Sequence, residues 1–219
     1  MLNLKKIAVT GGFCSGKTTV ATLFKEAGAY CVNADVIGHN LLESDPFIKT
    51  KVEEICSSSN QEIETRNSKN LSFQPFNRKK IADIVFSHKN KLHQLESLLQ
   101  PKIWNHIEEL YNQIKSQTAS YLCFVVEVPL LFEKTWDAWF DAILYVQASP
   151  LLSTQWLQQR DHISTREEAE QHWHKRSQYF LPEEEKKKKS TWVIHNTGGK
   201  DDIKKQIDPI IEQIKTLHF

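Results

Sequence analysis

The sequence has little of what marks several non-globular classes of protein. Its 28 Lys and Arg residues are matched by 27 Asp and Glu residues, so the formal net charge is only +1. Binding of nucleic acid or of an acidic membrane through bulk charge is therefore not expected. Seven glycines and seven prolines are too few for a linker-rich or fibrous chain. No apolar run approaches the roughly 18 residues that a membrane span needs, so we expect a folded chain with a sizeable core.

Cysteine is also scarce. Cys14, Cys31, Cys56 and Cys123 form no C-x-x-C pair, and no secretory leader is evident. We therefore expect free thiols in a cytoplasmic protein.

The first 33 residues follow the order strand, glycine turn, helix, strand. Residues 7–10 are apolar and β-branched and end at a pair of glycines. Beyond Lys17, apolar residues recur with helical spacing as far as Gly28, a typical helix C-cap. A second short strand is predicted over 30–32. This order predicts an α/β nucleotide-binding fold with a parallel sheet.

The middle of the chain is predicted to be helical. Residues 36–117 contain several helical pieces, one of which is expected to begin at Pro101. The stretch 150–190 is also helical in pattern. In it, Glu183–Glu185 precede Lys187–Lys189 by four residues, which indicates a solvated face with ion pairs or, as a second interpretation, a surface that attracts phosphate.

Three further strands are predicted from apolar runs. Residues 121–128 are almost continuously apolar, as expected for a central parallel strand covered on both faces. Residues 142–146 repeat this pattern, and a weaker last strand is predicted at 192–195.

Residues 11–18 carry the recognisable chemistry. Their sequence, Gly-Gly-Phe-Cys-Ser-Gly-Lys-Thr, fits G-x-x-x-x-G-K-[ST] and lies between a strand and a helix. The glycines allow successive N–H groups to turn toward phosphate oxygens at the positive end of the helix. Lys17 can reach the β- and γ-phosphates, and the Thr18 hydroxyl can coordinate Mg²⁺. The expected nucleotide contacts are Gly12, Phe13, Cys14, Ser15, Gly16, Lys17, Thr18 and Thr19.

Asp35 has two interpretations. It follows the second predicted strand, and adjacent carboxyl ends of parallel strands open onto the same crevice. A carboxylate there can accept the proton of an attacking hydroxyl or help to hold the metal. It can equally be the N-cap of a helix that begins at Val36.

Four segments together resemble the bacterial dephospho-CoA kinases. These are Thr10–Val20, Asn33-Ala-Asp35, Val128-Pro-Leu-Leu-Phe-Glu133 and Ile194–Gly198, and the resemblance runs from about residue 6 to residue 210. That family transfers the γ-phosphate of ATP to the 3′-hydroxyl of the ribose of dephospho-CoA, the last step of coenzyme A synthesis. The resemblance therefore implies ATP and dephospho-CoA as substrates and Mg²⁺ as the cofactor.

The resemblance also implies roles for single residues. Asp35 becomes the base toward the ribose hydroxyl, and Lys17 and Arg160 complete the catalytic set. Asn196 and Gly198 match the segment that contacts the adenine of ATP. The implied acceptor contacts are Thr10, Asp35, Arg78, Pro129, Leu130 and Glu133.

The architecture implied by the family is a P-loop three-layer α/β sandwich. It consists of a parallel five-stranded sheet, a helical acceptor insertion and a helical lid within a single kinase domain, 1–219. The expected division is core 1–35, 118–148 and 191–219, acceptor region 36–117, and lid 149–190.

Two departures from the family pattern affect the chemistry. Asn33 replaces the first Asp of the family's Asp-Ala-Asp, which removes one charge near the metal. Trp156 falls where the family usually carries an arginine, one helical turn before Arg160, so either Arg160 or Arg166 takes over its work or the enzyme is slow.

Some alternatives stay open. The chain can be another P-loop kinase, acting on a nucleoside monophosphate or a related small hydroxyl acceptor, or a nucleotide-binding regulatory protein that has lost efficient catalysis. Phe13 is interpreted as a packing residue. Glu127 either assists the metal through water or merely ends its strand, and the second interpretation is favoured.

Overall fold

The computed structural model describes residues 4–57, 81, 84–85, 87–117, 121–177 and 180–216, without the side chains of Lys175 and Arg176. The chain divides into two compact units. The first comprises Met1–Asn33 together with Tyr111–Phe219, and the second comprises Ala34–Leu110. Each unit is described by itself.

The first unit is built on a five-stranded sheet in the order β2-β3-β1-β4-β5, and every pairing in it is parallel. The predicted α/β fold with a parallel five-stranded sheet is therefore confirmed. The strands are β1 (Lys6–Gly11), β2 (Tyr30–Asn33), β3 (Phe124–Glu127), β4 (Ala142–Ala148) and β5 (Trp192–Asn196).

Strand β3, which lies between β2 and β1 in the sheet, is shorter than its apolar run suggests. The run begins at Tyr121, whereas β3 begins at Phe124, because its neighbour β1 begins only at Lys6 and the first bond between them runs from Phe124 N to Lys5 O, 2.7 Å. Leu122 N instead donates to Gly28 O at 3.1 Å, and Cys123 O accepts from Tyr30 N, the first residue of β2, at 2.9 Å.

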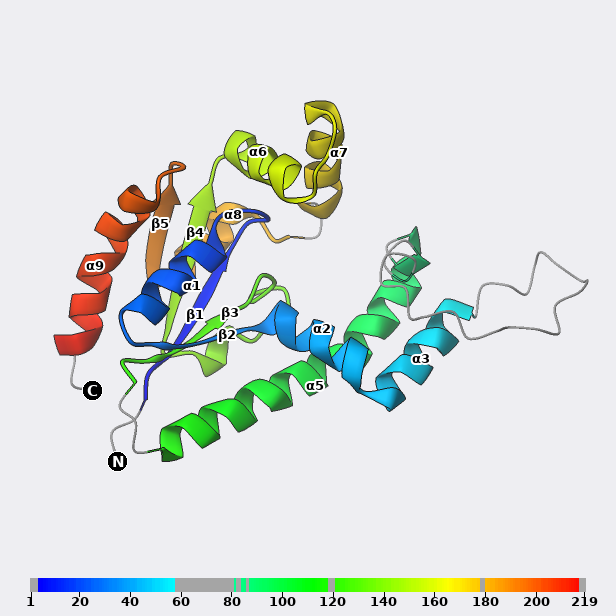
Figure 1. Cartoon of the computed structure of the whole chain (residues 1–219), viewed down its shortest axis with the longest axis horizontal. Helices are drawn as coiled ribbons and strands as arrows, with labels where there is room; N and C mark the ends of the chain where they lie inside the picture. Colours follow the sequence, from blue (N-terminus) through cyan, green and yellow to red (C-terminus); the bar gives the residue numbers. More distant parts are fainter. Residues whose placement is uncertain are drawn as a thin grey trace, which may run out of the picture. The chain divides into compact units, whose positions relative to one another are not determined.

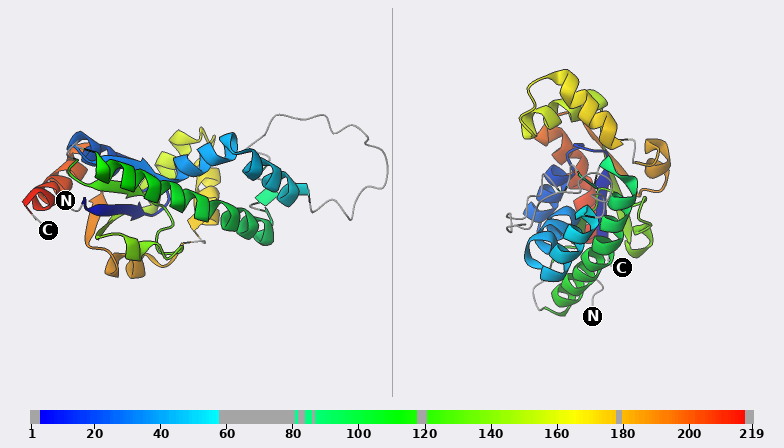
Figure 2. Two further views of the ribbon diagram at one scale, coloured as in Figure 1. Left: turned by 90° about the horizontal axis from the view of Figure 1, so that it is seen from below. Right: turned by 90° about the vertical axis from the view of Figure 1, so that its right-hand side faces the viewer.

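Two helices cover one face of the sheet, as Figures 1 and 2 show. They are α1 (Lys17–Glu26) and α9 (Lys200–Thr216). α1 ends at Glu26, with Ala27 as its C-cap, and Gly28 follows with φ 96°, near the glycine stop that the sequence predicts. Buried aliphatic side chains of both helices meet those of the strands and form the main core, which includes Ile7, Val9, Val20, Phe24, Val125, Leu144, Val146, Ile194, Ile203 and Ile207.

Aromatic side chains cover the other face. Phe124 lies edge-on to Tyr111 at 5.4 Å and to Trp139 at 6.3 Å between ring centroids. Trp139 belongs to the 3-10 helix η1 (Asp137–Trp139). The short helix α8 (Glu183–Lys188) lies on the same side of the sheet, opposite α1 (Figure 2).

Within the predicted lid segment, 149–190, the helices α6 (Pro150–Arg160) and α7 (Arg166–Ser177) lie beyond the carboxyl ends of the strands (Figure 1), whereas α8 lies against the sheet. α6 begins with proline at its first position, and the Ser149 hydroxyl caps it by accepting from Leu152 N at 3.3 Å. α7 packs against α6.

The predicted ion pairs on α8 are present in part. Lys187 lies 2.7 Å from Glu184 and 3.7 Å from Glu183. Lys186, in contrast, is only 2% exposed, so this helix is not solvated on every side.

The described part of the second unit is helical, as expected for 36–117. It contains α2 (Ala34–Ser44), α3 (Pro46–Ser57) and the first part of α5 (Lys89–Ser116). α3 begins where the Asp45 carboxylate accepts from Phe47 N and Ile48 N, at 2.9 and 3.2 Å.

The prediction that a helix begins at Pro101 is wrong, because Pro101 lies inside one continuous helix, α5. Proline there removes one N–H donor, and its ring crowds the carbonyl of the preceding turn. Beyond the proline, the burial of Ile107 and the packing of Ile103 against Gly38 of α2 favour the continuous helix.

No helix in the described part of the chain is long and apolar enough to cross a membrane.

Candidate active site

The loop between β1 and α1 has the backbone that its glycines allow. Gly16, the N-cap of α1, has φ 94°, and a Cβ atom there would lie 2.3 Å from Asn196 Nδ2. Gly11 has φ 153°, and a Cβ atom there would lie 2.3 Å from Val146 O. Neither position can take a side chain without displacing its neighbour, so the two glycines of the motif are required sterically.

Lys17 is folded back over this loop. Its side chain is buried, and its ammonium donates to Gly12 O at 2.7 Å and to Gly11 O at 3.3 Å. The positive charge is therefore held at the rim of the loop, beside the N-terminus of α1, where it can meet phosphate oxygens.

Glu127, the last residue of β3, binds side chains from α1 and β2. Its buried carboxylate accepts from the Thr18 hydroxyl, at 2.9 Å to Oε1 and 3.2 Å to Oε2, and from Asn33 Nδ2 at 2.8 Å. Glu127 is the last residue of β3, as the favoured interpretation expects, but its carboxylate also has two partners; a role toward the metal stays a prediction. An acidic residue at the end of the most apolar run of the sequence was the available signal, since an acid is rarely buried without partners.

This oxygen cluster fits a magnesium ion. Mg²⁺ in kinases is held by one or two protein oxygens, while water and substrate phosphates fill its other positions. The Thr18 hydroxyl and the Glu127 carboxylate are 2.9 Å apart at the edge of the phosphate loop, and they supply two such oxygens.

Asn196 holds the phosphate loop from the other side. Its buried amide donates from Nδ2 to Ser15 O at 2.9 Å and accepts from Gly198 N at 3.0 Å. The side chain therefore contacts the backbone of the loop. Ser15 Oγ, which is buried, has no hydrogen-bond partner among the described residues.

The end of β3 also carries the predicted acceptor contacts of the first unit. The Thr10 hydroxyl, buried, donates to Pro129 O at 3.4 Å, and Leu130 is half-buried. Glu133 Oε1 accepts from Leu181 N at 2.8 Å and lies 3.3 Å from Lys186 Nζ. Glu133 Oε2 is buried without a partner in the described part of the chain.

Arg160, at the end of α6, reaches the phosphate loop. The guanidinium carbon lies 5.1 Å from the centre of the Phe13 ring. Its Nε and Nη2 donate to the Asp161 carboxylate at 2.7 and 3.1 Å. The hydrogen bond to Asp161 raises the pKa of the Arg160 guanidinium above its ordinary value, so the side chain stays cationic.

The remaining predicted residues belong to different parts of the chain. Asp35 belongs to the second unit, where it is exposed in the first turn of α2. Because α2 begins at Ala34, Asp35 is not its N-cap. Arg78 lies outside the described residues. Cys14 has φ 54° within the loop, and Thr19 N donates to Gly16 O in the first turn of α1.

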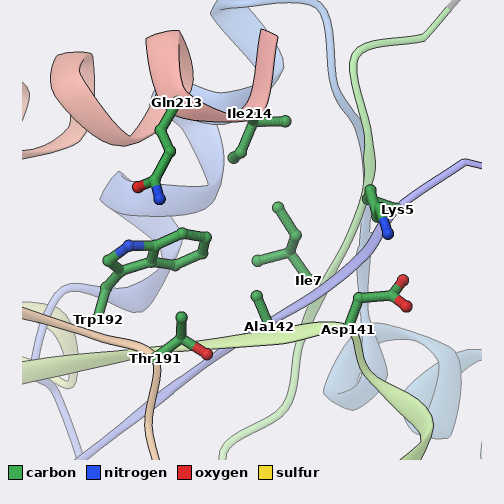
Figure 3. A pocket seen from close by; sticks show the side chains of 8 residues that line it. All are labelled: Lys5, Ile7, Asp141, Ala142, Thr191, Trp192, Gln213 and Ile214. Carbon is green, nitrogen blue, oxygen red and sulfur yellow. The ribbon is translucent and has the colours of Figure 1, made fainter. Parts of the chain in front are cut away.

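A pocket lies at the amino ends of the strands, the end of the sheet opposite the phosphate loop (Figure 3). Its volume is about 280 Å³, and the side chains of Ile7, Trp192 and Ile214 point into it. Lys5 and Asp141 stand at its side. It is formed at the amino ends of β1, β4 and β5, whereas the phosphate loop follows the carboxyl end of β1, so the pocket is separate from the nucleotide site.

The parallel sheet, the glycine loop with its lysine and the helical segment that carries an arginine to the loop define a P-loop phosphotransferase. The family model described as dephospho-CoA kinase matches residues 5–202. The chain therefore belongs to the dephospho-CoA kinase family, and the resemblance seen in the sequence is confirmed.

Relatives match along almost the whole chain. The chain is 31% identical over 215 residues to the dephospho-CoA kinase of Protochlamydia amoebophila and 32% identical to that of Chlamydia pneumoniae, with 98% of each chain covered in both cases. Among solved structures, TT1252 from Thermus thermophilus is similar with a TM-score of 0.71 and 26% identity, over 96% of this chain and 98% of that one. The dephospho-CoA kinase from Campylobacter jejuni shares the fold, with a TM-score of 0.56, 24% identity and coverage of 96% and 97%.

Proposed function

We propose that the protein transfers the γ-phosphate of ATP to the ribose 3′-hydroxyl of dephospho-CoA, which yields coenzyme A and ADP. The observation that carries the proposal is the grouping of Lys17, Thr18 and Glu127 at the carboxyl ends of neighbouring strands in a member of this family. We also propose that the protein acts in the cytoplasm, in agreement with its four free cysteines.

Phosphate binding is assigned to the loop and its lysine. The N–H groups of residues 12–18 and the N-terminus of α1 face the phosphate oxygens. Lys17 exchanges its bonds to Gly11 O and Gly12 O for oxygens of the β- and γ-phosphates, which neutralises charge as it shifts toward the β-γ bridge.

Thr18 and Glu127 would hold the metal. A Mg²⁺ ion held there would supply positive charge that offsets the charge of the phosphates. Glu127 would hold the ion directly or through water, and the bonds from Thr18 and Asn33 fix the carboxylate for that task. Because residue 33 is Asn, the carboxylate at this point is that of Glu127.

The acceptor hydroxyl needs a base, and we assign Asp35 to it. The assignment is supported by the family's Asp-Ala-Asp motif and by the exposure of Asp35, which leaves it accessible to a substrate. We propose that the second unit, with Arg78, and the segment Pro129–Glu133 bind the acceptor. The helices of 149–190 then act as a lid that excludes water, which would otherwise take the phosphate.

The decisive measurement is steady-state ADP release with and without dephospho-CoA. We expect turnover that depends on dephospho-CoA, at about 1–100 s⁻¹ as in other kinases, and no turnover with nucleoside monophosphates. Lys17→Ala should abolish turnover and weaken ATP binding, whereas Asp35→Ala should abolish turnover with ATP binding preserved. Near-normal turnover of Asp35→Ala would remove Asp35 as the base.

A regulatory protein without efficient catalysis is the alternative that Trp156 raises. ATP binding without ADP release that depends on dephospho-CoA would support it. A turnover about three orders of magnitude higher in Trp156→Arg than in the wild type would also support it, because the wild type would then lack an essential cation. A catalytic arginine acts on this scale.

A further inference from the structure

The lid arginine and the phosphate loop are in contact in a way that the proposed reaction does not require. Helix α6, Pro-Leu-Leu-Ser-Thr-Gln-Trp-Leu-Gln-Gln-Arg, contains one basic side chain, Arg160, at its last position. Of the two arginines considered as replacements for a cation at Trp156, Arg166 pairs with Glu170 at 2.8 Å. Arg160, in contrast, lies over the Phe13 ring.

Two groups determine the direction of the Arg160 guanidinium. Phe13 offers the face of its ring at 5.1 Å from the guanidinium carbon, within the range of a cation–π contact. Asp161 accepts from Nε and Nη2 at 2.7 and 3.1 Å. These two hydrogen bonds fix the plane of the forked guanidinium group. More than half of the Arg160 side chain remains exposed, 53%, so the other donors of the fork stay open to a ligand.

We propose that Phe13 and Asp161 are positioning residues that hold Arg160 at the phosphate loop, ready for the γ-phosphate of ATP. Phe13 lies four residues before Lys17 in the same loop, so a group stacked on its ring is carried beside the phosphate site. A preorganised cation loses less entropy when it meets its anion. The phosphate loop itself therefore selects a position of the lid, and Phe13 does more than pack.

The inference rests on the proposed function for the role of the γ-phosphate, but its test needs no acceptor. ADP has the α- and β-phosphates that the loop binds and lacks the γ-phosphate. If Phe13 acts through Arg160, its loss weakens binding of a nucleoside triphosphate and leaves ADP binding unchanged. If Phe13 only shapes the loop, both nucleotides bind more weakly.

The experiment is isothermal titration of the full chain with Mg²⁺ and either ADP or the slowly hydrolysed analogue ATPγS. In Phe13→Leu, the Kd of ATPγS should rise about two- to fivefold, the size of an exposed cation–π contact, with the Kd of ADP unchanged. Phe13→Tyr keeps the ring and should match the wild type. Arg160→Lys, at an exposed position, keeps the charge but loses the planar fork, and should resemble Phe13→Leu.

A double-mutant cycle completes the test. Arg160→Gln should weaken ATPγS binding, and adding Phe13→Leu to it should weaken binding no further, because the two residues act as one unit. Additive effects, equal weakening of ADP and ATPγS, or unchanged binding in Phe13→Leu would each overturn the inference. Absence of ADP release that depends on dephospho-CoA in the wild type would instead overturn the proposed function and leave this result standing.

Discussion

The side-chain amide of Asn33 donates a 2.8 Å hydrogen bond to the carboxylate of Glu127, a residue that is only 6% exposed. The family motif has Asp at the position of Asn33, and the contact gives a physical reason for the exchange. Two carboxylates at this distance could not both be ionised without strong repulsion. The amide at 33 and the acid at 127 are therefore complementary parts of one arrangement.

The first prediction is that Asn33→Asp destabilises the protein in a pH-dependent way. The pair would hold a proton, so the folded-state pKa of one carboxyl would lie above its unfolded value. Stability is then retained at low pH and lost as the pH rises through that pKa. We expect a fall in the free energy of unfolding of about 1–3 kcal/mol at pH 8 and a smaller fall at pH 5, measured by urea denaturation.

A double variant in which residues 33 and 127 exchange their amide and carboxylate groups provides the control. In Asn33→Asp/Glu127→Gln the amide and the carboxylate change places, so the count of charges and donors is that of the wild type. The double variant should recover most of the lost stability and its pH dependence should disappear. Equal stability of Asn33→Asp and the wild type at pH 8 would contradict the role given to this contact.

A second prediction concerns Asn196, which binds Ser15 O and Gly198 N. Asn196→Ala would leave both backbone groups without these partners, at about 1–3 kcal/mol for each buried group, and would loosen the loop. The Kd values of ADP and ATPγS should both rise, by about tenfold, unlike in Phe13→Leu. His195→Ala, an exposed neighbour on the same strand, is the matched control. A rise for ATPγS alone would show that Asn196 does not act through the loop.

How far the sequence predicts the molecule depends on the range of the interaction involved. The phosphate loop could be recognised because its residues are neighbours in the chain and their spacing is dictated by the backbone. The partners of Glu127 and Lys186 could not be predicted, because they lie 109 and 53 residues away, and no local pattern reports such a pairing. Pro101 misled for the opposite reason: its local preference for a first turn is overridden by packing along α5.

A third prediction concerns pH and the buried thiols. Burial raises the pKa of Cys31 to about 11 and that of Cys123 to about 12, whereas an unfolded thiol titrates near about 8.5. The folded protein thus retains these protons where the unfolded chain has lost them. The free energy of unfolding should fall as the pH rises from about 8.5 to about 11.

Denaturation at pH 8 and pH 10 would measure this slope, and Cys31→Ala/Cys123→Ala should reduce it. Alkylation with iodoacetamide at pH 8.5 gives a second measurement, because only the thiolate reacts. Cys31 and Cys123 should be labelled in the native protein far more slowly than in guanidinium chloride. Rapid native labelling of both would contradict the raised pKa values.

The fourth prediction concerns the ion pair between Glu133 and Lys186, which are 12% and 3% exposed in their side chains. Lys186 Nζ also lies 4.6 Å from the centre of the Phe180 ring, and Glu133 accepts from Leu181 N. The pair thus ties the returning end of the lid segment to the loop after β3. Lys186→Met would leave a buried carboxylate without its cation and should lower the free energy of unfolding by about 3–5 kcal/mol.

Removing both charges distinguishes two effects: the destabilisation caused by a buried carboxylate without its cation, and the contribution of the ion pair itself. Glu133→Gln/Lys186→Met retains an oxygen for Leu181 N and should recover most of the stability, because a buried ion pair contributes little over apolar packing. If the tie sets the lid, however, the double variant should keep its stability and still show more hydrolysis of ATP by water relative to transfer, since lid closure excludes water. A stable double variant with wild-type coupling would mean that the pair serves the fold alone.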